Sequence, residues 1–160
     1  MPITHRGRDE VRRMRDRLTS IFTQIDGAGL PSELISHYSR YLAVLVSGYA
    51  EQSVKELVRQ YVRTHADHRS QRYVGHQLKR IRNIDDDRLR EILQSLDTTW
   101  WDDLQAEYAN ELEAFKSVAV VRNNVSHGGD SGITISTVRQ YFDQISTVLS
   151  FLADRLDSRK

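Results

Sequence analysis

Apolar side chains recur every three or four residues along most of the chain, and this spacing constrains the fold more than any other feature. Residues spaced in this way line one face of an α-helix, whereas a strand exposes alternate residues on opposite faces. Few stretches of this sequence alternate with a period of two. The sequence therefore predicts an all-α protein, an antiparallel helical bundle of about five to six helices.

Residues that break or start helices divide this pattern into segments. Pro31 follows a first helix expected over residues 8–26, and Ser32 is a candidate N-cap for a long second helix. A shorter basic helix is expected around Tyr73, and the aspartates at 85–87 suit the start of the next helix. The buried face of the second helix is expected to contain Leu34, Tyr38, Tyr41, Leu42, Leu45, Tyr49, Val54, Leu57, Val58 and Tyr61.

The length of 160 residues corresponds to about one domain with a core of its own. We expect residues 1–30 to form an N-terminal helical extension and residues 31–157 to form the main helical domain. The absence of cysteine excludes disulfides, cysteine-ligated metals and thiol nucleophiles. The arginine-rich start has no apolar signal segment, and no run is long enough to span a membrane. A cytoplasmic protein without a membrane partner is expected.

Basic residues gather in one part of a chain whose net charge is only +1. Between Arg59 and Arg82 the single acidic residue is Asp67. The cationic segment consists of Arg59, Arg63, Arg69, Arg72, Lys79, Arg80 and Arg82. Arginine binds phosphate as a planar fork and stacks on bases, so the segment indicates either a site for RNA or a solvated helix face. Tyr73 within it is suited to stacking on a base, but we expect it in the core.

The most specific pattern follows the apolar part of the fifth expected helix, where Arg122, Asn123, Ser126 and His127 precede Gly128. One interpretation is purely structural. Asparagine and serine favour helix ends, and glycine is the usual residue just after a C-cap. The other interpretation is chemical, because a guanidinium and an imidazole together suit reactions at phosphate.

Arg122, Asn123 and His127 together resemble the ribonuclease motif of the HEPN superfamily, in which Arg and a polar residue precede His by a short spacer. Residues 41–53 are also similar to the long helix of RiboL-PSP-type HEPN domains, and the resemblance extends over about residues 34–152. Arg63 and His68 have the same separation but lack the helix-ending glycine, so the pair near Gly128 is the better candidate.

The resemblance implies a metal-independent endoribonuclease, a toxin or defence effector that needs no cofactor. Attack by the RNA 2′-hydroxyl would leave a 2′,3′-cyclic phosphate and a 5′-hydroxyl. In this interpretation His127 is the general acid and base, Arg122 stabilises the phosphate, and Asn123 orients it. The alternatives are a non-catalytic HEPN module that binds RNA or protein, and a helical adaptor in which the motif is only a C-cap.

Helix geometry limits how these groups meet. Five residues of ideal helix turn by about 500°, which places Arg122 and His127 about 140° apart. Either the helix unwinds near Ser126, or two chains share the site; the resemblance implies a homodimer with a composite active site. Glu51 and Ser126 are expected behind the reacting groups. The resemblance implies that Glu51 holds Arg122, and the alternative is an ordinary pair with Lys55 four residues later. An antitoxin or another operon-encoded protein is a further expected partner.

Overall fold

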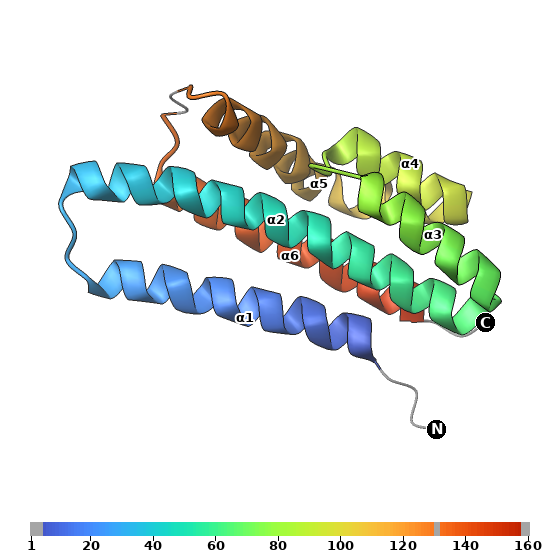
Figure 1. The fold of residues 1–160 in the computed structure, drawn as a ribbon. Helices are drawn as coiled ribbons and strands as arrows, with labels where there is room; N and C mark the ends of the chain where they lie inside the picture. The colour runs from blue at the N-terminus through green and yellow to red at the C-terminus, as the bar shows by residue number, and fades with distance from the viewer. Residues whose placement is uncertain (1–4, 130–131, 158–160) are drawn as a thin grey trace.

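The computed structural model describes residues 5–129 and 132–157. These residues form six helices and no strand (Figure 1). The helices are α1 (Arg6–Gly27), α2 (Ser32–His65), α3 (His68–Arg80), α4 (Asp86–Leu96), α5 (Thr98–Ser126) and α6 (Ile135–Asp157). This confirms the expected all-α bundle. Among these helices, none has an apolar stretch long enough to cross a membrane.

Aspartate side chains start three of the helices. The Asp67 Oδ1 accepts hydrogen bonds from the backbone N–H groups of Arg69 and Ser70, at 2.8 and 3.1 Å. Asp85 and Asp97 cap α4 and α5 in the same way. Such bonds satisfy N–H groups that have no partner within the helix. The expected start of the fourth helix is therefore confirmed. The expected Ser32 cap is wrong, because Ser32 is the first residue of α2 and forms no side-chain cap.

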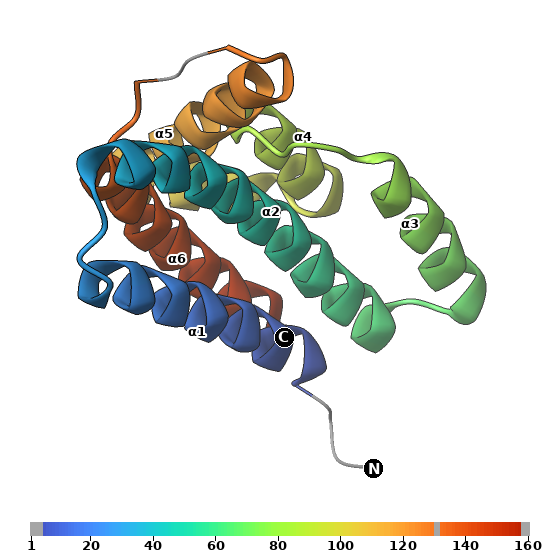
Figure 2. The same ribbon diagram turned by 60° about the vertical axis from the view of Figure 1, so that its left-hand side comes forward.

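The long helix α2 lies at the centre of the bundle, where it packs against α1, α5 and α6. Figures 1 and 2 show α1, α2 and α6 side by side, with α5 and α4 beyond them. The short helix α3 turns back along the C-terminal half of α2. The polypeptide after α3 then crosses to α4 close to α5, where Asn83 binds Ala119 and Asn123 in the C-terminal half of α5.

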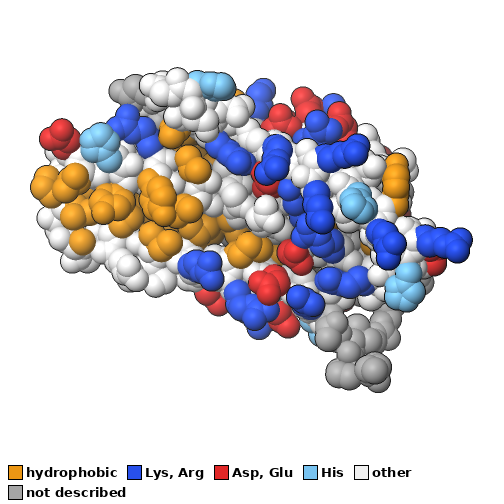
Figure 3. All heavy atoms as spheres, viewed as in Figure 1, with side chains coloured by type: hydrophobic (Ala, Val, Ile, Leu, Met, Phe, Trp, Pro, Cys, Tyr) orange, Lys and Arg blue, Asp and Glu red, His pale blue; other side chains and the backbone are white. Residues whose placement is uncertain are grey.

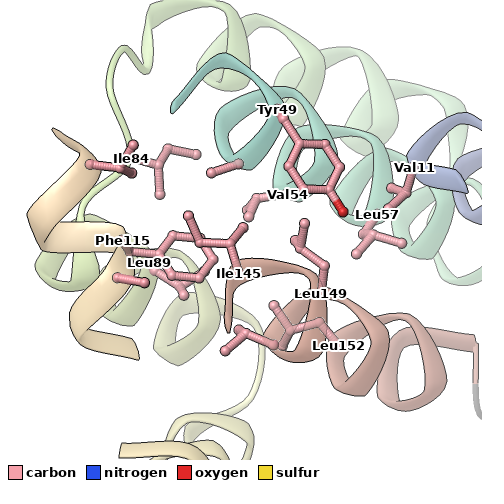
Figure 4. Packing of buried hydrophobic residues seen from close by; sticks show 14 of the residues in the cluster. Val11, Tyr49, Val54, Leu57, Ile84, Leu89, Phe115, Ile145, Leu149 and Leu152 are labelled. Carbon is pink, nitrogen blue, oxygen red and sulfur yellow. The ribbon is translucent and has the colours of Figure 1, made fainter. Parts of the chain in front are cut away.

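The core is continuous across these helices. Tyr49 and Leu57 of α2, Phe115 of α5 and Leu149 of α6 belong to one buried cluster (Figure 4). Burial of this apolar surface is the main favourable contribution to folding. Val11, Leu18 and Phe22 of α1 lie in the same cluster. The division of the chain at residue 30 stays a prediction, and in space α1 is packed on the rest of the bundle.

A close backbone approach joins the start of α1 to α2. Gly7 is buried, and its N–H donates to the Gln60 Oε1 at 3.2 Å. A Cβ at Gly7 would lie 2.8 Å from the backbone oxygen of Glu56 and 2.8 Å from the Gln60 Cβ. The two helices can therefore approach this closely only because residue 7 has no side chain.

Two parts of the predicted core are wrong. Leu34, Tyr38 and Tyr41 are 45%, 41% and 55% exposed, because they lie on a flank of α2 that no described helix covers. Figure 3 shows a band of exposed hydrophobic side chains in this region. Tyr73 is 66% exposed instead of buried. It is five residues from Leu78, the buried residue of α3, which places it about 140° around the helix from the face that packs on α2.

Candidate functional site

The end of α5 positions the candidate motif. The helix has a kink at Tyr108, continues from there through Ser126, and has His127 as its C-cap. The N–H of Gly128 donates to the Val125 carbonyl at 3.1 Å, and the N–H of Gly129 donates to the Asn124 carbonyl at 2.8 Å. These two bonds, together with the positive φ of 76° at Gly128, form a Schellman cap. The structural interpretation of the glycines is therefore correct, and the cap places His127 at an exposed helix end.

The Arg122 side chain is held in place by a carboxylate of α2. Its Nη1 donates to the Glu51 Oε2 at 2.9 Å. The Arg122 side chain is partly exposed, whereas that of Glu51 is almost fully buried. The guanidinium therefore has one fixed edge in the protein and another part open to solvent. A hydrogen bond from Arg to a buried carboxylate also restricts rotation of a long side chain.

Glu51 also binds two other groups. Its Oε1 accepts from the Lys55 Nζ at 2.9 Å, and its Oε2 accepts from the backbone N–H of Asn83 at 2.7 Å. Both alternatives for Glu51, holding Arg122 and pairing with Lys55, are thus present together. Burial raises the pKa of the Glu51 carboxyl, but the bonds from Lys55, Asn83 and Arg122 outweigh burial and lower its pKa below the ordinary value. Glu51 is therefore a carboxylate at neutral pH.

Asn83, which no pattern in the sequence marks as functional, links this carboxylate to the motif. Its Nδ2 donates to the Asn123 Oδ1 at 2.9 Å and to the Ala119 carbonyl at 3.3 Å. Its Oδ1 accepts from the Ser47 Oγ at 3.1 Å. Asn83 has a positive φ of 51°, a conformation that asparagine tolerates better than most residues. The only signal in the sequence was an asparagine in a short connection, which by itself indicates a turn.

His127 and Arg122 do not meet within one chain. Of the two alternatives that the sequence left open, unwinding near Ser126 does not occur in the single chain, because α5 is helical through that residue. Within the described residues, the His127 ring has no hydrogen bond or ion pair. Beside it, His37, Tyr41 and Val44 of α2 line an open hollow with Val125, Gly128 and Gly129. The exposed flank of α2 therefore adjoins the histidine end of α5.

The cationic segment divides into two parts in the structure. Arg59 pairs with Glu56, and the Arg63 Nη2 donates to the Gln60 Oε1 at 3.3 Å, both on α2. The remaining members lie on α3 and just after it, and none forms an ion pair with a described residue. These members are Arg69, Arg72, Lys79, Arg80 and Arg82.

Most arginines elsewhere do have acidic partners. They include Arg8, Arg12, Arg13, Arg15, Arg88, Arg90, Arg122, Arg139 and Arg155. Figure 3 shows basic side chains concentrated over α3 and the neighbouring part of α2. The positive charge on α3 is therefore not neutralised within the described protein, and it is available to an anionic ligand.

The described residues contain no group of three or more histidine, aspartate and glutamate side chains arranged to hold a metal ion. His65 stacks on Tyr61 with ring centroids 4.2 Å apart. His68 and His76 lie on α3 beside the basic side chains.

A family model for the RiboL-PSP-HEPN domain matches residues 10–158. The chain belongs to the RiboL-PSP-HEPN family. The match extends beyond the resemblance inferred over residues 34–152 and includes most of α1. HEPN domains are often ribonucleases, so membership supports a ribonuclease or nucleotide-binding module. No curated protein and no solved structure matches this chain.

Proposed function

We propose that this HEPN protein is a metal-independent endoribonuclease. The observation that carries the proposal is the contrast between Arg122, anchored on a buried carboxylate, and His127, exposed five residues later at the end of the same helix. A fixed guanidinium can stabilise charge on a phosphoryl group. An exposed imidazole can act as a general acid and a general base. The RNA 2′-hydroxyl would be the nucleophile.

The proposed roles follow from the contacts of each residue. Arg122 would bind a non-bridging phosphate oxygen with the part of its guanidinium that Glu51 leaves open. Asn123, whose side-chain oxygen accepts from Asn83, would direct its amide N–H groups toward the phosphate. His127 would remove the 2′-hydroxyl proton or protonate the leaving 5′-oxygen. The products would be a 2′,3′-cyclic phosphate and a 5′-hydroxyl. Ser126, the last residue of α5, would fix the backbone position of His127.

We further propose that the active site forms between two copies of the chain. Arg122 and His127 lie on different sides of α5, so a two-fold axis would bring the motifs of both copies to one phosphate. The exposed flank of α2, with Tyr38 and Tyr41, adjoins the histidine end of α5 and would form the contact. Exposed apolar patches of this kind are typical of interaction surfaces.

The uncompensated cations of α3 support RNA as the substrate, because phosphate neutralisation supplies most of the affinity for nucleic acid. In this proposal Arg59 and Arg63 have a lesser part, since their side chains already bind residues of α2. A role as a toxin or defence effector, with an antitoxin or another operon-encoded partner, rests on the family resemblance alone.

Incubation of the purified protein with total RNA in excess EDTA tests the reaction. We expect cleavage to 2′,3′-cyclic phosphate ends, and we expect Arg122→Ala or His127→Ala to abolish it. Asn124→Ala is the matched control, since Asn124 is exposed on the same helical turn and lies outside the proposed site. Binding without cleavage would instead support a non-catalytic module, and neither binding nor cleavage would support an adaptor unrelated to RNA.

The shared site has its own test. Tyr41→Glu places a charge on an exposed position, so the chain should fold normally but become monomeric and lose cleavage. Thr19→Glu, on the exposed face of α1, should change neither property. A wild-type protein that is monomeric at micromolar concentration and still cleaves RNA would contradict the composite site.

A further inference from the structure

Helix α3 presents an aromatic ring to solvent. Tyr73 is the most exposed of the large hydrophobic side chains in the described chain, at 66%. It makes no hydrogen bond or ring contact with another described residue. Since α3 buries only Leu78, packing within this chain does not account for an aromatic residue at position 73. A ligand that covered the ring would remove its apolar surface from water, which is favourable.

Cations surround the ring. Tyr73 lines an open hollow on α3 together with Arg69, Arg72, His68 and His76. Neither arginine forms an ion pair with a described residue. The carboxylate that caps α3, that of Asp67, is engaged by Ser70 and by two backbone N–H groups of α3. The hollow therefore combines a π-surface with at least two free guanidinium groups and no free acid.

This combination fits one class of ligand better than others. Single-stranded RNA offers unpaired bases that stack on aromatic rings and phosphates that bind arginine. In a duplex the bases are stacked on one another and their faces are covered, so a duplex could use only the charges. An acidic polypeptide would satisfy the arginines but offers few planar groups for the ring.

The course of the chain connects this hollow to the motif. From Tyr73 to Arg80, α3 rises about 10 Å toward the segment that contains Asn83. Lys79, Arg80 and Arg82 lie along this path without ion pairs to described residues, and Asn83 binds Asn123. A strand stacked on Tyr73 could thus continue along α3 toward Arg122.

We propose that Tyr73, with Arg69 and Arg72, forms a base-stacking site that binds an unpaired nucleotide of RNA at a distance from the proposed cleavage motif. The inference rests on the proposed function and specifies its substrate as single-stranded RNA. Tyr73 anchors the strand by stacking, and the arginines bind the phosphates on either side.

Binding is measured in a His127→Ala background, which prevents cleavage, with a labelled single-stranded RNA and a duplex of the same sequence. Tyr73→Ala should weaken single-strand binding about tenfold, because stacking of one base on an aromatic side chain increases affinity by about a factor of ten. It should leave duplex binding unchanged. Tyr73→Phe should restore binding, since stacking needs the ring and not the hydroxyl. Gln77→Ala, on an exposed position of the same helix, is the control.

Salt dependence separates stacking from charge. Tyr73→Ala should weaken binding without changing the slope of log K against log salt, because no charge is lost. Arg72→Ala should reduce that slope by about 0.7. Thermal unfolding should be unchanged in both variants, because both side chains are exposed.

The outcomes distinguish this inference from the proposed function. Unchanged single-strand affinity of Tyr73→Ala, or equal weakening of single-strand and duplex binding, would overturn the stacking site even if the wild-type protein cleaves RNA. Tight binding of polyglutamate with no binding of RNA would overturn it as well. Tyr73-dependent binding of single-stranded RNA by a wild-type protein that does not cleave would support the stacking site and refute the endoribonuclease.

Discussion

The substitution Glu51→Gln tests the buried ionic network most directly. The amide has nearly the same size as the carboxylate and keeps one oxygen acceptor, but it removes the negative charge that faces Lys55 and Arg122. The Lys55 side chain is only 5% exposed, so its ammonium would remain buried with the Ile81 carbonyl as its main partner. Removing one partner of a buried ion pair costs about 3 kcal/mol at the lower end of the usual range. We expect this loss in the free energy of unfolding.

Urea denaturation at pH 7 measures this loss, and thermal unfolding should show a decrease of about 6–12 °C for a chain of this length. Glu56→Gln is the matched control on the same helix. Glu56 pairs with Arg59, but both side chains are more exposed, so its loss should cost less than about 1 kcal/mol. The double variant Glu51→Gln/Lys55→Met should regain stability, because it no longer buries an unpaired charge. A Glu51→Gln protein as stable as the Glu56→Gln control would refute the reasoning.

Three further predictions concern the backbone and pH. Asn83→Gly and Asn83→Ala should both reduce RNA cleavage, since both lose the bond to Asn123. In urea denaturation the alanine variant should be less stable than the glycine variant by about 1 kcal/mol, because φ is positive at residue 83. Gly7→Ala should destabilise by about 1–3 kcal/mol through its clash with α2, whereas Gly48→Ala, with open space around it, should stabilise by up to about 1 kcal/mol; equal melting temperatures would contradict this. The pKa of Glu51 is lowered on folding, so its contribution to stability is complete above the unfolded pKa of about 4.3 and is lost as the pH falls through the folded pKa. Wild type and Glu51→Gln should therefore have converging free energies of unfolding in urea denaturation under acid conditions.

The helices were predictable because their signals are local. A spacing of three to four apolar residues and an aspartate at position 85 act within one or two turns, and the structure places α4 where Asp85 indicates. Burial was less predictable. Tyr41 and Tyr73 follow the same apolar spacing as core residues, yet whether another helix covers them depends on the packing of the whole bundle.

The candidate site shows the same difference. Arg122 and His127 stand in one short segment, so their types and spacing were visible in the sequence. The contact between Arg122 and Glu51 joins residues 71 positions apart, and the sequence left it open between two alternatives. Asn83 was missed because its importance comes from four contacts to distant residues and a positive φ, none of which leaves a local pattern.

Glu51 binds two cationic side chains, Arg122 and Lys55. If Arg122 were replaced, the carboxylate would still be neutralised by Lys55 and would keep the N–H of Asn83. Loss of Arg122 would therefore remove the group proposed for chemistry without leaving an orphaned charge inside the protein. A lineage could lose the proposed catalysis in a single mutation and retain an intact scaffold, free to evolve as a binding protein.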